Sequence, residues 1–86
     1  MTAATGITFG PDGNLYVGTQ VSASSVNRYA AVTGEFIEVF ADSVDARGIT
    51  FGPDGNLYVS DASLDAVQRF DGTTGAFIDF FVGSSG

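Results

Sequence analysis

Hydrophobic residues fall in short stretches along the chain, and clusters of turn-forming residues separate these stretches. Each half of the chain has four stretches rich in β-branched and aromatic residues and bounded by Gly, Pro, Asp, Asn and Ser, a pattern typical of short β-strands. No stretch keeps an apolar period of about 3.6 residues over several turns, so the sequence predicts an all-β fold. The predicted strands cover residues 7–9, 15–19, 26–30 and 36–41, then 49–51, 57–61, 67–71 and 77–82.

The two halves of the chain repeat one another. The stretch GITFGPDGNLYV starts at Gly6 and again at Gly48 and is identical at all twelve positions. The first copy is then one residue longer, within a polar stretch where a loop accepts an insertion best. We therefore divide the chain into two repeats. The first covers residues 1–47, with a core over 6–41 and a connector over 42–47, and the second covers residues 48–86, with a core over 48–82 and a C-terminal connector over 83–86.

Each repeat has the size and pattern of one blade of a β-propeller, which is four antiparallel strands in about 40–45 residues. Gly-Pro-Asp-Gly-Asn between the first two strands favours a hairpin turn, since Pro presets φ, Asp bonds its own backbone and Gly accepts a positive φ. Gly34 and Gly75 close a second turn before the last strand of each repeat. Leu15, Tyr16 and Val17 are apolar on both faces of their strand, which predicts a sheet covered on both sides by neighbouring sheets.

The residues of each repeat resemble the NHL repeat. The resemblance rests on Gly-Ile-Thr-Phe-Gly-Pro-Asp-Gly-Asn-Leu-Tyr-Val, a polar loop, Val-x-Arg before an aromatic residue, a Gly turn and Phe-Ile-x-x-Phe, and it extends from Gly6 to about Val82. The repeats are also similar to blades of gluconolactonase/SMP-30-like and lyase-type propellers. This resemblance implies that the Gly-Ile-Thr-Phe strand lines a central channel and that the Phe-Ile-x-x-Phe strand lies outermost. It implies no single activity, because such blades carry unrelated functions.

Two blades cannot form a propeller by themselves, because each end of the pair leaves an apolar sheet face open. A ring of identical chains in head-to-tail contact would cover both faces. Two blades per chain allow only even rings, and the resemblance implies six blades. We therefore predict a homotrimer that forms a six-bladed, C3-symmetric propeller, with a homotetramer of eight blades as the alternative.

Composition narrows the classes of function. The chain has 44% hydrophobic residues and a formal net charge of −7, with three Arg and no Lys, so we expect no nucleic-acid or anionic-membrane partner. There is no Cys and no His, which excludes disulfides, thiolate metal sites and the Ser-His-Asp and Cys-His catalytic arrangements. We find no signal peptide or transmembrane segment in this sequence, and we predict no particular subcellular compartment.

Carboxylates are the remaining candidates for chemistry. Asp61 and Asp65 follow the second strand of the second repeat, and oxygen ligands of this kind suit Ca²⁺. The similar lyase and lactonase propellers use several acidic, Asn and His ligands from different blades, and this chain lacks most of that set. The alternative is a structural Asp that caps the loop by bonding backbone N–H groups. We predict no catalytic residue and no required cofactor, and keep Asp61 and Asp65 as candidate Ca²⁺ ligands.

The connector between the repeats holds a second group of charges. Asp45 and Arg47 precede a predicted inner strand and are candidates for a pair at the channel mouth, with solvated loop charges as the alternative. Arg28 and Arg69 occupy matching positions, which predicts a repeated ion pair between strands or blades. We interpret Asp12 and Asp54 as structural turn residues.

Three functions are compatible with these observations. The first is a non-catalytic, self-assembling propeller module that binds a partner through its loops or its channel. The second is a Ca²⁺-assisted hydrolase or lactonase. The third is a designed or recently duplicated propeller fragment with no selected ligand, since near-perfect repetition of twelve residues indicates recent duplication or construction.

Overall fold

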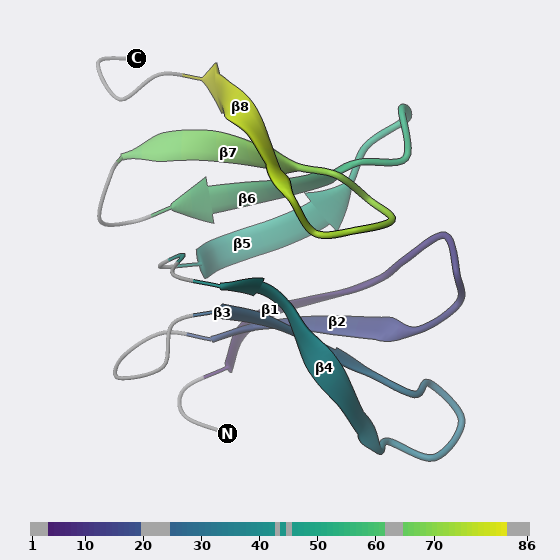
Figure 1. The fold of residues 1–86 in the computed structure, drawn as a ribbon. Helices are drawn as coiled ribbons and strands as arrows, with labels where there is room; N and C mark the ends of the chain where they lie inside the picture. The colour runs from purple at the N-terminus through teal and green to yellow at the C-terminus, as the bar shows by residue number, and fades with distance from the viewer. Residues whose placement is uncertain (1–3, 20–24, 43, 45, 62–64, 83–86) are drawn as a thin grey trace.

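The computed structural model describes residues 4–19, 25–42, 44, 46–61 and 65–82. These residues form two four-stranded antiparallel sheets, one from each repeat, and confirm the all-β prediction (Figure 1). No membrane-spanning helix occurs in this part of the chain. The strands of the first sheet are β1 (Ala4–Phe9), β2 (Leu15–Thr19), β3 (Ser25–Tyr29) and β4 (Phe36–Asp42). Those of the second are β5 (Ala46–Phe51), β6 (Leu57–Asp61), β7 (Ala66–Phe70) and β8 (Phe77–Val82).

Each sheet is a simple meander in which every strand pairs with the next one along the chain. The predicted hairpin turns form: Gly13 and Gly55 have φ values of 82° and 80°, as required by the turn between the first two strands of each sheet. The sheets stack face to face, with β1 beside β5 at one end and the outer strands β4 and β8 farther from that contact (Figure 1). Two stacked four-stranded meanders are compatible with a pair of propeller blades.

The first strand of each sheet, β1 or β5, is longer than the sequence predicts. These strands begin at Ala4 and Ala46 rather than at residues 7 and 49, and a β-bulge interrupts each ladder before Gly6 and Gly48. A bulge adds one unpaired residue to its strand, here Thr5 or Arg47. Neither residue is apolar, so the hydrophobic pattern gives no signal that the strand continues through them.

The core lies between the two sheets. It joins Tyr16, Val26 and Phe40 of the first sheet to Leu57, Val59 and Phe70 of the second. Tyr16 is 1% exposed and Leu57 is fully buried. The core therefore comes from one face of each sheet, and the other face of each sheet takes no part in it.

Candidate functional site: the two open sheet faces

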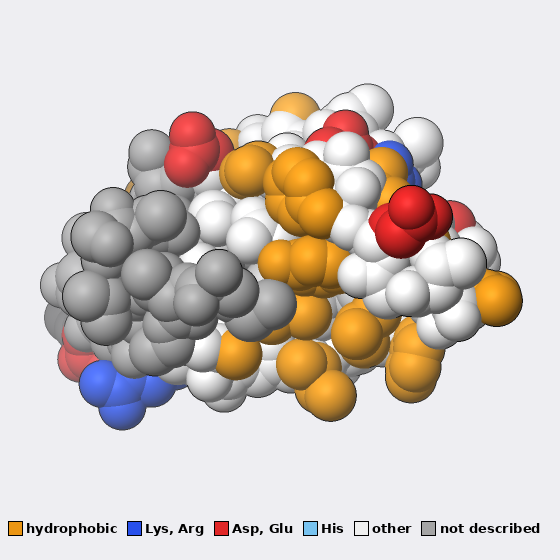
Figure 2. All heavy atoms as spheres, turned by 90° about the horizontal axis from the view of Figure 1, so that it is seen from below, with side chains coloured by type: hydrophobic (Ala, Val, Ile, Leu, Met, Phe, Trp, Pro, Cys, Tyr) orange, Lys and Arg blue, Asp and Glu red, His pale blue; other side chains and the backbone are white. Residues whose placement is uncertain are grey.

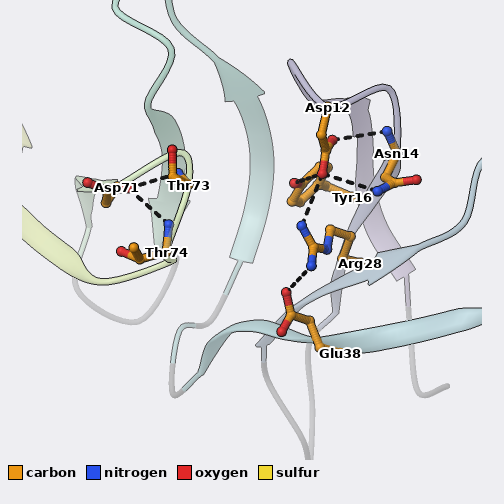
Figure 3. Close-up of polar contacts among 8 residues, drawn as sticks. All are labelled: Asp12, Asn14, Tyr16, Arg28, Glu38, Asp71, Thr73 and Thr74. Carbon is orange, nitrogen blue, oxygen red and sulfur yellow. Dashed lines mark hydrogen bonds and ion pairs between the residues drawn. The ribbon is translucent and has the colours of Figure 1, made fainter.

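A polar network fixes the orientation of Tyr16. Its hydroxyl donates to Asp12 at 2.9 Å, and Arg28 Nη1 donates to the same carboxylate oxygen at 3.0 Å (Figure 3). Arg28 also forms an ion pair with Glu38 on the neighbouring strand. Gly10 leaves room for the ring, since a Cβ there would lie 2.3 Å from a ring carbon of Tyr16. The network therefore ties the first turn, β2, β3 and β4 together around one aromatic side chain.

The same network occurs in the second sheet. Tyr58 donates to Asp54 at 2.7 Å, and Arg69 Nη2 donates to Asp79 at 2.7 Å. Arg69 Nη1 also lies 3.6 Å from Asp54. The structure thus confirms the predicted repeated pairing of Arg28 and Arg69 as cross-strand ion pairs and the structural role of Asp12 and Asp54.

Hydrogen bonds favour the ionised forms of the two turn carboxylates, Asp12 and Asp54. Burial by itself would raise the pKa of Asp12, but hydrogen bonds from Asn14, Tyr16 and Arg28 hold that pKa below its ordinary value. The hydrogen bond from Tyr58, together with that from the Asn56 backbone, lowers the pKa of Asp54. At neutral pH these carboxylates are structural acceptors, which is a poor state for proton transfer.

In the first sheet the Tyr16 face is covered. The ring of Tyr16 packs edge-on against Phe40 of its own sheet at 4.9 Å between centroids, and against Phe51 of the second sheet at 4.8 Å. Near the inner strands, Thr5 Oγ1 donates to the Ala46 carbonyl oxygen. This face is the one that the second sheet buries.

In the second sheet the matching face is open. Tyr58 packs edge-on against Phe81 at 5.1 Å, almost the geometry of Tyr16 and Phe40, but Phe81 is 57% exposed whereas Phe40 is 6% exposed. A groove of about 420 Å³ lies here, and its lining is almost entirely apolar. The groove is lined by Thr50, Gly52, Pro53, Tyr58, Val67, Phe81 and Val82.

The first sheet also has an open face, on its opposite side. Ile7 and Phe9 are 65% and 66% exposed there, whereas their repeat counterparts Ile49 and Phe51 pack against the core. Seen from the side of the first sheet, hydrophobic side chains gather in a band across the surface (Figure 2). The molecule therefore presents two different open apolar faces, one at each end of the stack.

The two candidate Ca²⁺ ligands, Asp61 and Asp65, differ in burial. Asp61 is 2% exposed at the end of β6 and accepts a hydrogen bond from Gln68 Nε2 at 2.8 Å. Asp65 is exposed and has a φ of 50° in the turn before β7. Within the described residues, no three Asp, Glu, His or Cys side chains form a group that could hold a metal ion. The geometry thus gives Asp61 a role in joining β6 to β7, and Ca²⁺ binding stays a prediction.

Arg47 lies within β5, at its bulge, rather than in a connector before the strand. Its side chain is exposed, and no ion pair joins it to any other described residue. Asp45, its predicted partner, lies outside the described residues, so the channel-mouth pair stays a prediction. No residue pattern along the chain indicates the bulge, because a bulge depends on how two strands pair.

Neither comparison with known proteins supplies a relative: no protein-family model matches this chain, and no curated protein sequence matches it significantly.

Acid should weaken the turn before β8 through Asp71. The carboxylate accepts from the backbone N–H groups of Thr74 and Thr73 at 2.9 and 2.8 Å, and these bonds lower the pKa of Asp71 (Figure 3). A lowered folded-state pKa stabilises the protein above the unfolded pKa of about 3.9, and this stabilisation is lost as the pH falls through the folded value. We expect wild type to melt above Asp71→Asn at pH 6, and the gap in Tm to narrow as the pH falls below the unfolded pKa of about 3.9. A gap that is constant with pH would contradict this role.

Proposed function

We propose that this chain is a non-catalytic, self-assembling β-propeller module whose copies pack face to face into a closed ring. One observation carries the proposal. On the open face of the second sheet, Tyr58, Val67 and Phe81 repeat Tyr16, Val26 and Phe40, which are buried between the two sheets, and the two aromatic pairs have nearly the same geometry. A surface built to be covered in one repeat is left uncovered in the other.

Burial of the exposed apolar side chains would make association of the copies favourable. Ile7, Phe9 and Phe81 are each more than half exposed, and burying a side chain of this size contributes about 1.5–3 kcal/mol. Soluble monomers rarely expose contiguous apolar patches of this kind at two ends of one molecule. Covering both faces is therefore a large source of stability for a chain of 86 residues, whose own core is small.

The two faces differ, so association is head-to-tail. If each contact between copies repeats the relation of the two sheets within a chain, every blade is turned by the same angle from the one before, and the assembly closes as a ring. The similarity of the repeats to six-bladed propellers favours three copies, with four copies and eight blades as the alternative. The loops gathered at the mouths of such a ring would form a scaffold for a binding partner.

The mass of the protein in solution tests this function. Light scattering or native mass spectrometry of the full chain at micromolar concentration should give three times the mass of one chain. Four copies would retain the ring and replace six blades by eight. A single chain or an isologous dimer would overturn the proposal.

A matched pair of variants links assembly to the open faces. Phe9→Asp places a charge on the open face of the first sheet, at a side chain that contributes little to the core of its own chain, and should abolish the assembled mass. Val32→Asp makes the same change in charge at a turn residue that is 97% exposed, and should leave the mass unchanged. A Phe9→Asp variant that keeps the wild-type assembled mass would show that the first-sheet face plays no part in assembly.

A further inference from the structure

We propose a specific register for the contact between copies: the groove of the second sheet receives Phe9 and Ile7 of the next copy, as the first sheet receives Phe51 and Ile49 within the chain. This inference rests on the proposed ring and names the partner of each open face. The occupant is a second copy of this chain. Within the chain, Phe51 and Ile49 cover the face of the first sheet that matches the groove, and Phe9 and Ile7 are their counterparts in the first repeat.

The groove is already in its receiving shape. Its aromatic pair, Tyr58 and Phe81, meets edge-on at 86°, against 85° for Tyr16 and Phe40 in the covered face. The guanidinium groups behind them also match, with Arg69 at 5.6 Å from the Phe81 ring centroid and Arg28 at 5.9 Å from that of Phe40. Because the open groove needs no rearrangement, little ordering cost opposes the insertion of Phe9 beside Tyr58.

A backbone contact fixes the register at the outer end of the interface. Gly75, in the turn before β8, lies so close to the first sheet that a Cβ there would be 2.0 Å from the Phe40 carbonyl oxygen. Its counterpart Gly34 has nearly the same φ, 77° against 79°, but no described atom lies within 4 Å of the Cβ position. In the proposed register, the Phe81 carbonyl of the neighbouring copy lies over Gly34.

Two positions distinguish the junction between copies from the junction within a chain. Gly18 faces Ala46, and a Cβ on Gly18 would lie 3.0 Å from that of Ala46; its counterpart Ser60 would face Ala4 of the next copy. A shift of a few tenths of an ångström there accommodates the Ser side chain. Arg47 is the counterpart of Thr5, whose hydroxyl donates to the Ala46 carbonyl oxygen of the second sheet. In the proposed register Arg47 would donate to the Ala4 carbonyl oxygen of the next copy.

Mixing two variants of the full chain tests the register. Ser60 lies beside the groove on the open face of the second sheet, so Ser60→Arg places a long charged side chain on that face and leaves the first-sheet face intact. Phe9→Asp blocks the first-sheet face and leaves the groove intact. Each variant alone should stay a single chain. Mixed in equal amounts, they should form a one-to-one pair of twice the chain mass and nothing larger, as native mass spectrometry would show.

The outcomes separate the register from the ring. A wild-type ring with no pair in the mixture overturns the register and leaves self-assembly standing through another surface, such as β4 and β8. A wild-type chain that stays single at all concentrations overturns both. A mixture that builds rings also overturns the register, since each variant would then be using its blocked face.

Gly34→Asn provides a second test that does not depend on the apolar groove. Asn tolerates a positive φ, so the turn should fold, but its side chain would meet the Phe81 carbonyl of the neighbouring copy that covers the first sheet. We expect the concentration at half assembly to rise at least about tenfold, with an unchanged circular dichroism spectrum. Val32→Asn is the control and should assemble as wild type does. Normal assembly of a folded Gly34→Asn variant would overturn the register.

Discussion

Replacing Leu57 by Ala is expected to cost the chain about 2–5 kcal/mol of stability, enough to unfold it near physiological temperature. Leu57 is fully buried between the sheets, in the cluster that also holds Tyr16 and Val59. Removing its side chain loses transfer free energy and leaves a cavity that two hydrogen-bonded sheets cannot close. Urea or thermal unfolding followed by circular dichroism measures the loss.

Leu15 is the matched control, because it occupies the same position of the identical twelve-residue stretch. In the chain by itself, as in the Phe9→Asp background, Leu15 is only half-buried on the open side of the first sheet, so Leu15→Ala should cost clearly less than Leu57→Ala there. In the assembled wild type a neighbouring copy would cover Leu15, and the two costs should become similar. A smaller cost for Leu57→Ala than for Leu15→Ala would contradict the packing between the two sheets.

Replacing Gly72 by Ala is expected to destabilise the second sheet by roughly 1–3 kcal/mol or more. A Cβ at Gly72 would lie 1.7 Å from the Gly55 carbonyl oxygen, so one of two backbone turns must move. That movement would also break the hydrogen bond from the Gly72 N–H to Asn56 Oδ1, now 3.1 Å long. The matching residue of the first repeat is Ala31, so repetition alone would predict a harmless change.

Gly48→Ala is the control for this steric effect. No described atom lies within 4 Å of a Cβ built on Gly48, and its φ is not in the left-handed region. Ala there should leave the melting temperature within about 2 °C of wild type, or raise it slightly, because Gly in a strand is less favourable than Ala. A comparable loss from both variants would show that the turn at Gly72 moves at little cost.

Local structure followed directly from the residues. Pro, Asp and Gly in GPDGN each meet one requirement of the turn, and Asp12 accepts from the Asn14 N–H at 3.0 Å as that turn demands. The strands over Leu15–Thr19 and Leu57–Asp61 begin and end where the β-branched and aromatic stretches do. These features depend on neighbours in sequence, so a pattern along the chain contains the necessary information.

Features of the site that depend on distant residues were less predictable. Tyr16 is apolar in the strand pattern, yet its hydroxyl is tied to Asp12 and its ring contacts Phe51 of the other repeat. The sequence offered Asp61 as a candidate Ca²⁺ ligand or a loop cap and did not indicate its partner, Gln68 of β7, beside which it is buried. In both cases the partner is brought in by pairing or stacking of strands, which no spacing along the chain specifies.

By itself, the sequence determined the eight strands, the turns between them and the division into two repeats, because strand and turn propensities act over a few residues. Only the tertiary structure decided which face of each sheet is covered. Tyr16 and Tyr58 lie in identical stretches, but Tyr16 is buried under the second sheet and Tyr58 lines an open groove. Two identical segments have the same local preferences, so the difference between them arises from position in the stack alone.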